Sequence, residues 1–211
     1  MAEHDFLPTN PAPAGPASGI AGLILAGGQG LRGASADKAL MSWRGEPLVS
    51  HVARRLAPQV GSLIVSVSRN ARAYEAFGTV VEDDPALGAD AGPLAGISAG
   101  LAAWQGHWLA CVPCDTPLLP DTLVARLVGA AQAAGAPVAV ATCMGRRHAA
   151  CMVVHGADPA VRENLARFLQ SGDRKLARWQ DQAGGIEVLF DDTPASFLNL
   201  NSAEDFAFAQ S

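Results

Sequence analysis

The sequence predicts an α/β domain with a mostly parallel central sheet, because short β-rich runs alternate with helical patterns from Gly19 onward. The strand runs lack the regular apolar and polar alternation of half-exposed strands, as expected when helices cover both faces of a sheet. A chain of 211 residues is long enough for one domain with a sizeable core. We therefore expect a single domain over residues 19–211, preceded by a disordered, proline-rich tail over residues 1–18.

Runs of apolar and β-branched residues predict seven strands, namely Ile20–Ala26, Leu63–Ser68, Thr79–Val81, Trp108–Val112, Val138–Thr142, Ala149–Val154 and Ile186–Phe190. Apolar residues at helical spacing predict helices at Pro47–Leu56, Gly92–Trp104, Pro120–Ala134, Asp158–Gln170 and Ser202–Gln210. Pro47 is expected in the first turn of its helix. A short turn over residues 144–147 joins two successive strand runs, so we expect the sheet to be mixed there.

Composition excludes several classes of protein. Hydrophobic residues make up 49% of the chain and charged residues 17%, which excludes a disordered protein. The net charge of -5 argues against a basic nucleic-acid-binding surface. The continuous apolar runs are too short to span a membrane, and the N-terminus lacks the pattern of a secretion signal. Four cysteines do not make a disulfide scaffold, so we expect a cytoplasmic protein with no nucleic-acid or membrane partner.

Glycine and acidic residues follow several of the predicted strands. Gly27 and Gly28 follow the first, Asp83 follows the third, and Asp115 follows the fourth. The carboxyl ends of parallel strands lie at one edge of the sheet, where ligands of such folds bind. Consecutive backbone N–H groups suit phosphate oxygens, and a carboxylate suits a divalent cation. The pattern predicts a phosphate and metal site at this edge.

The loop after the first strand carries fixed positive charge as well as glycines. Arg32 and Lys38 lie in it, and Lys175 is the other lysine of the chain. Residues 28–33 also fit the GxGxxG dinucleotide pattern, but the second strand arrives late and no acid ends it. The GxxxxGK[ST] phosphate loop is absent from the sequence. A mononucleotide triphosphate therefore fits this loop better than a dinucleotide.

The loop resembles the LAGG-x-x-x-R-x-x-x-x-DK motif of molybdenum cofactor guanylyltransferases, the MobA family, through residues 25–28, Arg32 and residues 37–38. Five further segments resemble family motifs in the family's order: 45–48, 81–83, 92–97, 113–117 and 199–204. Together they cover the chain from Gly22 to about Asp205. Gly33, Ala34 and Ser68 depart from the family's usual residues at their positions.

The resemblance implies a Rossmann-like, three-layer nucleotidyltransferase fold and transfer of GMP from GTP to Mo-molybdopterin, with release of pyrophosphate. It implies that Lys38, Arg32 and Asp115 are catalytic and that Asp115 binds Mg²⁺. The residues that it implies for GTP binding are Leu25, Ala26, Gly27, Gly28, Lys38, Asp83 and Asp115. For the pterin substrate it implies Asn199 and Asn201. Arg147 is added as a pterin-binding residue because residues 146–148 form a dense basic cluster.

The resemblance also implies the partners of the protein. We expect a monomer that makes transient contact with molybdopterin-synthesis proteins or with recipient molybdoenzymes. A related cytidylyltransferase that uses CTP on the same pterin is the alternative activity. A nucleotide-binding accessory protein without catalysis is the alternative outside the enzymes.

Structural roles stay open for several of these residues when the resemblance is set aside. Asp115 is also typical of a turn or helix cap, and Asp83 of a solvated acidic turn. Asn201 fits a helix cap, and the basic cluster over residues 146–148 fits a solvated hairpin tip.

Two further motifs favour structural roles over chemistry. Ser98 fits the GxSxG pattern of hydrolases but falls in a predicted helix with no strand before it. The four cysteines lie in or next to apolar strands, where cysteine behaves as a small hydrophobic residue rather than as a zinc ligand.

Overall fold

A computed structural model describes residues 19–27, 37–88 and 92–200. Within these ranges, seven strands form one sheet in the order β5-β4-β1-β6-β8-β7-β9. The strands of this sheet are β1 (Ile20–Leu25), β4 (Ser62–Val67), β5 (Thr79–Glu82), β6 (Trp108–Pro113), β7 (Val138–Cys143), β8 (Arg146–His155) and β9 (Ile186–Leu189). The disordered tail predicted for residues 1–18 lies outside the described residues.

The sheet is mostly parallel, with one reversed strand among those described. β1 runs parallel to β4 and β6, β4 to β5, and β7 to β9, whereas β8 is antiparallel to both β6 and β7. The reversal occurs at the turn between β7 and β8, where Met144 and Gly145 both have positive φ, as in two-residue hairpins. The predicted mixed sheet is therefore confirmed, and so is the position of its reversal.

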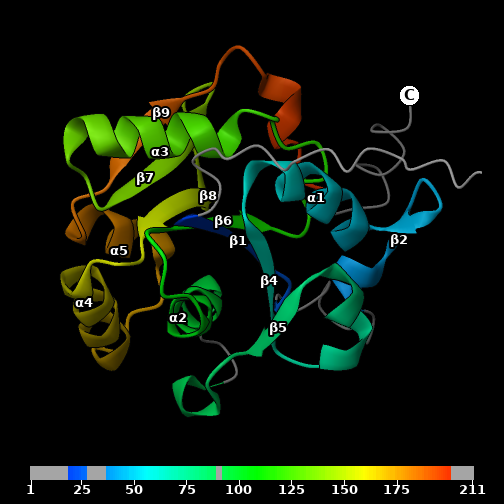
Figure 1. Cartoon of the computed structure of the whole chain (residues 1–211), viewed down its shortest axis with the longest axis horizontal. Coiled ribbons are helices and arrows are strands. Elements are labelled where there is room, and N and C mark those ends of the chain that lie inside the picture. Colours follow the sequence, from blue (N-terminus) through cyan, green and yellow to red (C-terminus); the bar gives the residue numbers. More distant parts are fainter. Residues whose placement is uncertain (1–18, 28–36, 89–91, 201–211) are drawn as a thin grey trace, which may run out of the picture.

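Helices cover both faces of the sheet. They are α1 (Leu48–Leu56), α2 (Pro93–Ala103), α3 (Leu123–Ala134), α4 (Pro159–Gln170) and α5 (Leu176–Gln182). Figure 1 shows α1 and α3 on one face and α2, α4 and α5 on the other, which makes three layers. The predicted three-layer α/β architecture is confirmed.

Each face of the sheet has its own hydrophobic core. In β1, neighbouring residues alternate, so that Ile24 packs into the core beneath α1 and α3 and Leu23 into the core beneath α2, α4 and α5. Both side chains are fully buried. Burial on both faces explains why the strand sequences are continuously apolar, and burial of this kind is the main favourable contribution to folding.

Several elements differ from the sequence predictions. A small hairpin of β2 (Ser42–Trp43) and β3 (Glu46–Pro47) precedes α1, so Pro47 stands just before the helix and not within its first turn. The 3₁₀ helix η4 (Ala71–Phe77) and helix α5 were not predicted, and β8 is longer than its predicted run. The helix predicted at Ser202–Gln210 lies outside the described residues.

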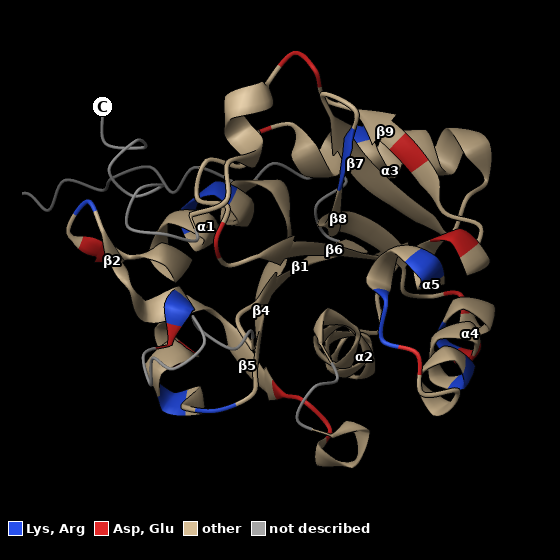
Figure 2. Ribbon diagram, turned by 180° about the vertical axis from the view of Figure 1, so that it is seen from behind, with Lys and Arg blue, Asp and Glu red and all other residues tan. Residues whose placement is uncertain are grey.

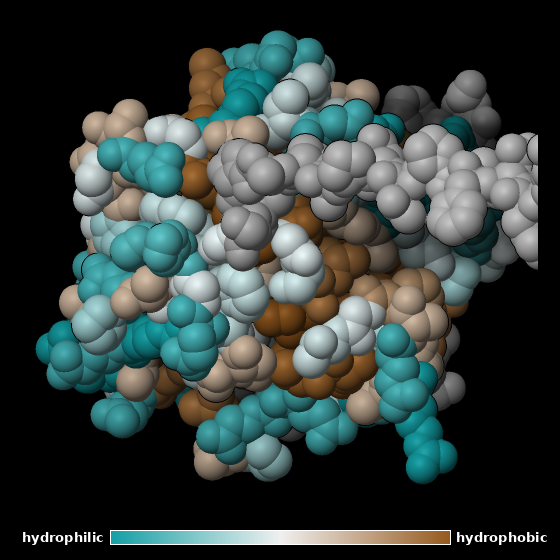
Figure 3. All heavy atoms as spheres, viewed as in Figure 1, coloured by the Kyte–Doolittle hydropathy of each residue, from teal (hydrophilic) through white to brown (hydrophobic). Residues whose placement is uncertain are grey.

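One face of the molecule carries an apolar area. Figure 3 shows it near the centre of that face, around β4, with hydrophilic residues below it and along the left of the view. Of the helices within the described ranges, none combines the length and apolarity that a membrane span requires.

Candidate active site

The carboxyl ends of β4, β1 and β6 meet at one edge of the sheet. Backbone hydrogen bonds continue past the strand ends, because Ala26 N donates to Ser66 O at 2.8 Å and Cys114 N donates to Leu25 O at 3.2 Å. The chain passes from β1 to β4 on one side, and β6 lies on the other, so the strand order reverses at β1. Such a switch point is where open α/β sheets bind their ligands.

Lys38 and Asp115 form an ion pair at this switch point. Lys38 begins the 3₁₀ helix η2 (Lys38–Leu40), and Asp115 lies two residues past the end of β6. Lys38 Nζ lies 2.6 Å from Asp115 Oδ2, and the two side chains are 18% and 17% exposed. The fold therefore brings together two of the predicted catalytic residues, which are 77 positions apart in the chain. A cation and a carboxylate in contact at this edge suit a phosphate and a divalent metal, respectively.

Asn199 is held next to Asp115 by Thr116. The fully buried Thr116 donates its hydroxyl proton to Asn199 Oδ1 at 2.9 Å, and the Thr116 hydroxyl oxygen lies 3.4 Å from Asp115 Oδ1. Leu200 N donates to Asp115 O at 2.8 Å. With the Asn199 carbonyl oxygen engaged, its amide NH₂ group remains as a donor. Asn199 thus lies beside the Lys38–Asp115 pair, as its predicted substrate role requires.

Gly27, Ser68 and Asp83 form the other side of the site. Ser68 Oγ donates to Gly27 O at 3.2 Å. A Cβ atom on Gly27 would lie 3.1 Å from Asp83 Oδ2 and 3.3 Å from Ser68 N, so a larger residue would crowd the acid. Figure 2 shows the acidic stretch that follows β5, to which Asp83 belongs. The backbone after β1 therefore runs directly past a carboxylate, which is the close approach that glycine allows.

Ser66 holds the Asp83 carboxylate in place, and Gly96 leaves room for Ser66. Ser66, which is 2% exposed within β4, donates its hydroxyl to Asp83 Oδ1 at 2.9 Å. A Cβ on Gly96 of α2 would lie 2.4 Å from Ser66 Oγ, so glycine is needed for the helix to pack here. Burial raises the pKa of the Asp83 carboxyl above its ordinary 3.8, and the Ser66 hydrogen bond opposes this in part.

The raised pKa of Asp83 predicts a pH-dependent cost to stability. The folded chain binds the proton of the Asp83 carboxyl more tightly than the unfolded chain does. The contribution of Asp83 to the free energy of unfolding is therefore most favourable below pH 3.8, and it is lost as pH rises through the folded pKa. We expect Asp83→Asn, which keeps an acceptor for Ser66, to unfold at a higher temperature than the parent chain at neutral pH. The difference is expected to shrink toward zero below pH 3.8.

Thermal unfolding followed by circular dichroism across this pH range measures the effect. Glu82→Gln is the matched control, because Glu82 is an exposed acid next to Asp83, and it is expected to leave the unfolding temperature almost unchanged. An Asp83→Asn chain that unfolds at or below the parent's temperature at neutral pH would contradict the burial argument.

The structure does not bring Arg147 to this site. Its guanidinium pairs with Asp181 at 2.7 Å and with Glu187 at 2.6 Å, on the face of the sheet that α5 covers. The adjacent His148 packs against Phe197 on the other face. Alternation along β8 directs the Arg147 side chain to the α5 face, so the structure does not bring it together with the Lys38–Asp115 pair, and its contact with the pterin stays a prediction.

The other predicted residues are placed as follows. Leu25 ends β1 and Ala26 and Gly27 follow it, all at the switch point. The predicted residues Gly28, Arg32 and Asn201 lie outside the described residues.

Ser66 and Thr116 are site residues that sequence reasoning missed. Each is almost completely buried, and each orients a predicted site residue by a hydroxyl hydrogen bond. The sequence does carry a signal, since Ser66 is a polar residue within the apolar strand run 63–67. A buried hydroxyl requires a partner, and here the partners are Asp83 and Asn199.

Neither Ser98 nor any of the four cysteines is placed as a nucleophile. Ser98 lies inside α2 and not at a strand-to-helix turn. All four cysteines are buried free thiols, and burial raises the pKa of Cys114 to about 12, with the nearby Asp115 adding to this. A thiol with such a pKa stays protonated and is a poor nucleophile at neutral pH.

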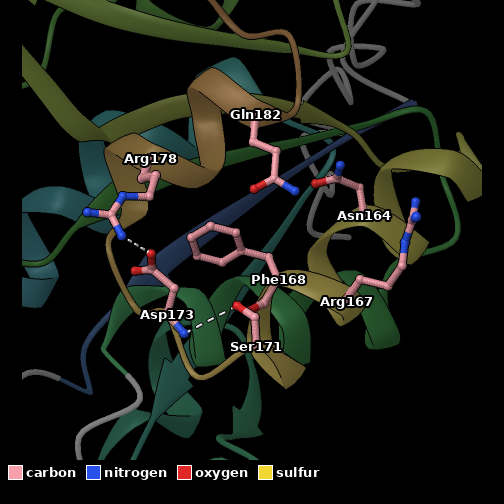
Figure 4. Close-up of a pocket in the computed structure, with 7 residues that line it drawn as sticks. All are labelled: Asn164, Arg167, Phe168, Ser171, Asp173, Arg178 and Gln182. Atoms are coloured by element: carbon pink, nitrogen blue, oxygen red, sulfur yellow. Dashed lines mark hydrogen bonds and ion pairs between the residues drawn. The ribbon is translucent and has the colours of Figure 1, made fainter.

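A pocket of about 320 Å³ lies between α4 and α5 (Figure 4). Two arginines line it, of which Arg178 is ion-paired with Asp173, and Phe168 forms one of its walls. The pocket shares no residue with the strand ends described above.

The donors at the switch point fit one magnesium ion. Within the described residues, no group of three or more His, Cys, Asp or Glu side chains could hold a metal by itself. Mg²⁺ does not need such a cage, because it keeps several waters and takes further oxygens from bound phosphates. Asp115 supplies the carboxylate for such a site, and its Oδ2 is occupied by the Lys38 ammonium in this structure.

Comparison with known proteins identifies the family. The family model of the MobA-like NTP transferase domain matches residues 22–185, well over half of the chain. The chain belongs to the MobA-like NTP transferase family. It is therefore a nucleotidyltransferase. Residues 25–27, Lys38, Asp83 and Asp115 lie within the matched part of the chain, and Asn199 follows it.

Relatives of this MobA-like transferase are similar over nearly their whole length. It is 40% identical to a molybdenum cofactor guanylyltransferase of Ralstonia pickettii over 90% of this chain and 95% of the relative. It is 43% identical to one of Acidovorax ebreus over 87% of this chain and 91% of the relative.

Solved structures share the fold at low sequence identity. The molybdopterin-guanine dinucleotide biosynthesis protein A of Archaeoglobus fulgidus has a TM-score of 0.70 at 17% identity, covering 90% of this chain and 96% of that one. The 2-C-methyl-D-erythritol 4-phosphate cytidylyltransferase of Thermus thermophilus has a TM-score of 0.65 at 16% identity, covering 89% and 96%. These two proteins share this fold although their names give them different substrates.

Proposed function

We propose that this chain is a molybdenum cofactor guanylyltransferase that transfers GMP from GTP to Mo-molybdopterin and releases pyrophosphate. The names of the relatives at 40–43% identity support this activity. The observation that carries it is the Lys38–Asp115 pair at the sheet's switch point, because this pair supplies the cation and the carboxylate that nucleotidyl transfer requires.

The reaction is an in-line displacement at phosphorus. An oxygen of the molybdopterin phosphate forms a bond to the α-phosphorus of GTP. The bond from the α-phosphorus to the bridging oxygen of the β-phosphate breaks, and pyrophosphate leaves with that electron pair. The protein's contribution is to hold the two phosphates in line and to neutralise the charge on the leaving pyrophosphate.

Each predicted residue has a part in this step. The backbone over Leu25, Ala26 and Gly27 receives the nucleotide. The Lys38 ammonium, which here pairs with Asp115, would contact the phosphates of a bound triphosphate. Asp83, oriented by Ser66, accepts hydrogen bonds from the nucleoside. Gly28 and Arg32 are proposed to complete the phosphate cradle.

Magnesium is the proposed cofactor, with Asp115 as its protein ligand. Bound Mg²⁺ would neutralise charge on the triphosphate and polarise the α-phosphate. Thr116 keeps Asn199 beside this carboxylate. Asn199, and Asn201 with it, are proposed to orient the phosphate of the pterin substrate.

GTP is favoured over CTP by the curated relatives, which are named guanylyltransferases at 40% identity or more. The cytidylyltransferase neighbours bear on the fold alone, because their identity is low. The enzyme is proposed to act in the cytoplasm as a monomer, to make transient contact with molybdopterin-synthesis proteins or recipient molybdoenzymes, and to need no nucleic acid or membrane.

A single assay tests the activity and its nucleotide. Purified protein is incubated with Mo-molybdopterin, Mg²⁺ and either GTP or CTP, and both pyrophosphate and dinucleotide are measured. We expect one pyrophosphate per guanine dinucleotide with GTP and much slower product formation with CTP. Preference for CTP would assign a cytidylyltransferase, and GTP binding without pyrophosphate release would assign a non-catalytic binding protein.

A further inference from the structure

Tyr74 is the only tyrosine of the chain, and its side chain is fully buried. It lies on the 3₁₀ helix η4, which follows the end of β4 and contacts α1. Its neighbours Ala73 and Glu75 are exposed, so the Tyr74 ring is the part of η4 that packs into the core beneath α1 and α3. This packing does not require the hydroxyl, because a phenylalanine ring would fill nearly the same space.

The Asp37 carboxylate lies near the buried Tyr74 hydroxyl. The hydroxyl oxygen is shielded from solvent and has no partner in regular hydrogen-bond geometry among the described residues. Burial raises the pKa of Tyr74 well above its ordinary 10, and the Asp37 carboxylate adds to this both as a hydrogen-bond acceptor and by its charge. A small movement of either side chain would therefore complete the hydrogen bond that a buried hydroxyl requires.

Asp37 is partly buried and directly precedes Lys38. It occupies the position before η2 where an aspartate usually caps the helix, yet its side chain makes no capping hydrogen bond. Its backbone oxygen accepts from Leu40 N at 3.0 Å, which joins Asp37 to the turn that carries Lys38. The Asp37 carboxylate therefore does not serve η2, and Tyr74 is a donor in a position to orient it.

Asp37, Lys38 and Asp115 form one cluster of charges. Burial raises the pKa of the Cys114 thiol most, Asp115 and Asp37 raise it further, and Lys38 lowers it, so all three charges lie near this thiol. Asp115 holds the Lys38 ammonium at 2.6 Å. An Asp37 carboxylate turned toward the ammonium would compete with Asp115 and with bound phosphates for the same positive charge. A hydrogen bond from Tyr74 would instead hold Asp37 toward the core.

We propose that Tyr74 is a positioning residue that acts on Lys38 through Asp37. Its hydroxyl donates to the Asp37 carboxylate, which keeps this carboxylate away from the Lys38 ammonium and leaves the ammonium to the phosphates of GTP. The inference rests on the proposed function, in which Lys38 offsets phosphate charge. Tyr74 itself touches no substrate, because its side chain is fully buried.

Tyr74→Phe, made in two backgrounds, tests this role, because it keeps the ring and removes the hydroxyl. In the parent chain it is expected to weaken Mg²⁺–GTP binding, measured by calorimetry, and to lower kcat, each by about tenfold, with the KM for Mo-molybdopterin unchanged. In a chain that carries Asp37→Asn, the same substitution is expected to change both quantities by less than about twofold, because the carboxylate that Tyr74 restrains is gone. Equal effects in the two backgrounds, or no effect in the parent, would overturn the proposal.

The contact itself can be measured without activity. Because the chain has one tyrosine, labelling tyrosine with ¹³C at Cζ gives a single signal in nuclear magnetic resonance spectra. Asp37→Asn is expected to shift this signal, whereas Glu75→Gln, an exposed acid next to Tyr74 on η4, is the matched control and is expected to leave it in place. A signal that Asp37→Asn does not move would also overturn the proposal. A parent chain that shows this shift and the effects on GTP binding but makes no dinucleotide would contradict the proposed function and leave the role of Tyr74 supported.

Discussion

Lys38→Ala is expected to lower the kcat of guanylyl transfer by about a hundredfold to a thousandfold, the usual effect of removing one group that stabilises transition-state charge. In the proposed reaction, the ammonium at this position offsets the charge on the departing pyrophosphate. Lys38→Arg is expected to keep the charge opposite Asp115 but to recover little activity, because a guanidinium does not place a point charge at the same position. Steady-state rates of dinucleotide formation measure both effects.

Lys175→Ala is the matched control, because Lys175 is the other lysine of the chain and its side chain is exposed. It is expected to retain the parent rate. Circular dichroism and thermal unfolding of each variant separate a loss of fold from a loss of chemistry. Folded Lys38→Ala with the parent's kcat would remove Lys38 from the catalytic site.

Asp115→Asn is expected to lower guanylyl transfer by at least about a hundredfold and to raise the Mg²⁺ concentration needed for half-maximal rate. The substitution keeps the size of the side chain and removes the negative charge that we propose binds the metal. The Mg²⁺ dependence distinguishes a lost metal ligand from a general disturbance, because a general disturbance lowers the rate equally at all Mg²⁺ concentrations.

Asp121→Asn is the matched control for Asp115→Asn. Asp121 follows Asp115 by six residues, and its exposed carboxylate pairs with Arg55 at 2.6 Å. Removal of such a surface pair has a small effect on stability. The control is expected to keep both the rate and the Mg²⁺ dependence of the parent. An Asp115→Asn chain that needs no more Mg²⁺ than this control would exclude Asp115 as the metal ligand.

The fold was predictable where the local pattern and the tertiary structure agree. Continuous apolar runs predicted all seven strands of the sheet, because strands such as β1 are buried on both faces. Helix α5 was missed because its seven residues are too few for a clear period. It is held by tertiary contacts, since Trp179 is fully buried and its indole N–H donates to Asn164 Oδ1 at 3.0 Å.

The site was predictable in part, because its motifs directly follow strand ends. Lys38, Asp115 and Asn199 come together as expected, although contacts over 77 or more positions are set by the sheet order and not by local sequence. The orientation of the basic cluster was not predictable. The pairing of β7 with β8 shifts register between Val140 and Ala141 of β7. This register helps determine which side chains of β8 face α5, and a shift of one residue would exchange the faces on which Arg146 and Arg147 lie.

The most direct test of the switch-point site is a crystal structure of the chain with a non-hydrolysable GTP analogue and Mn²⁺ in place of Mg²⁺. We expect the triphosphate to lie against the backbone after β1 with Lys38 Nζ in contact with its oxygens, and an anomalous peak for Mn²⁺ at the Asp115 carboxylate. A nucleotide bound away from the ends of β1 and β6, or a metal without Asp115 among its ligands, would contradict the site described here.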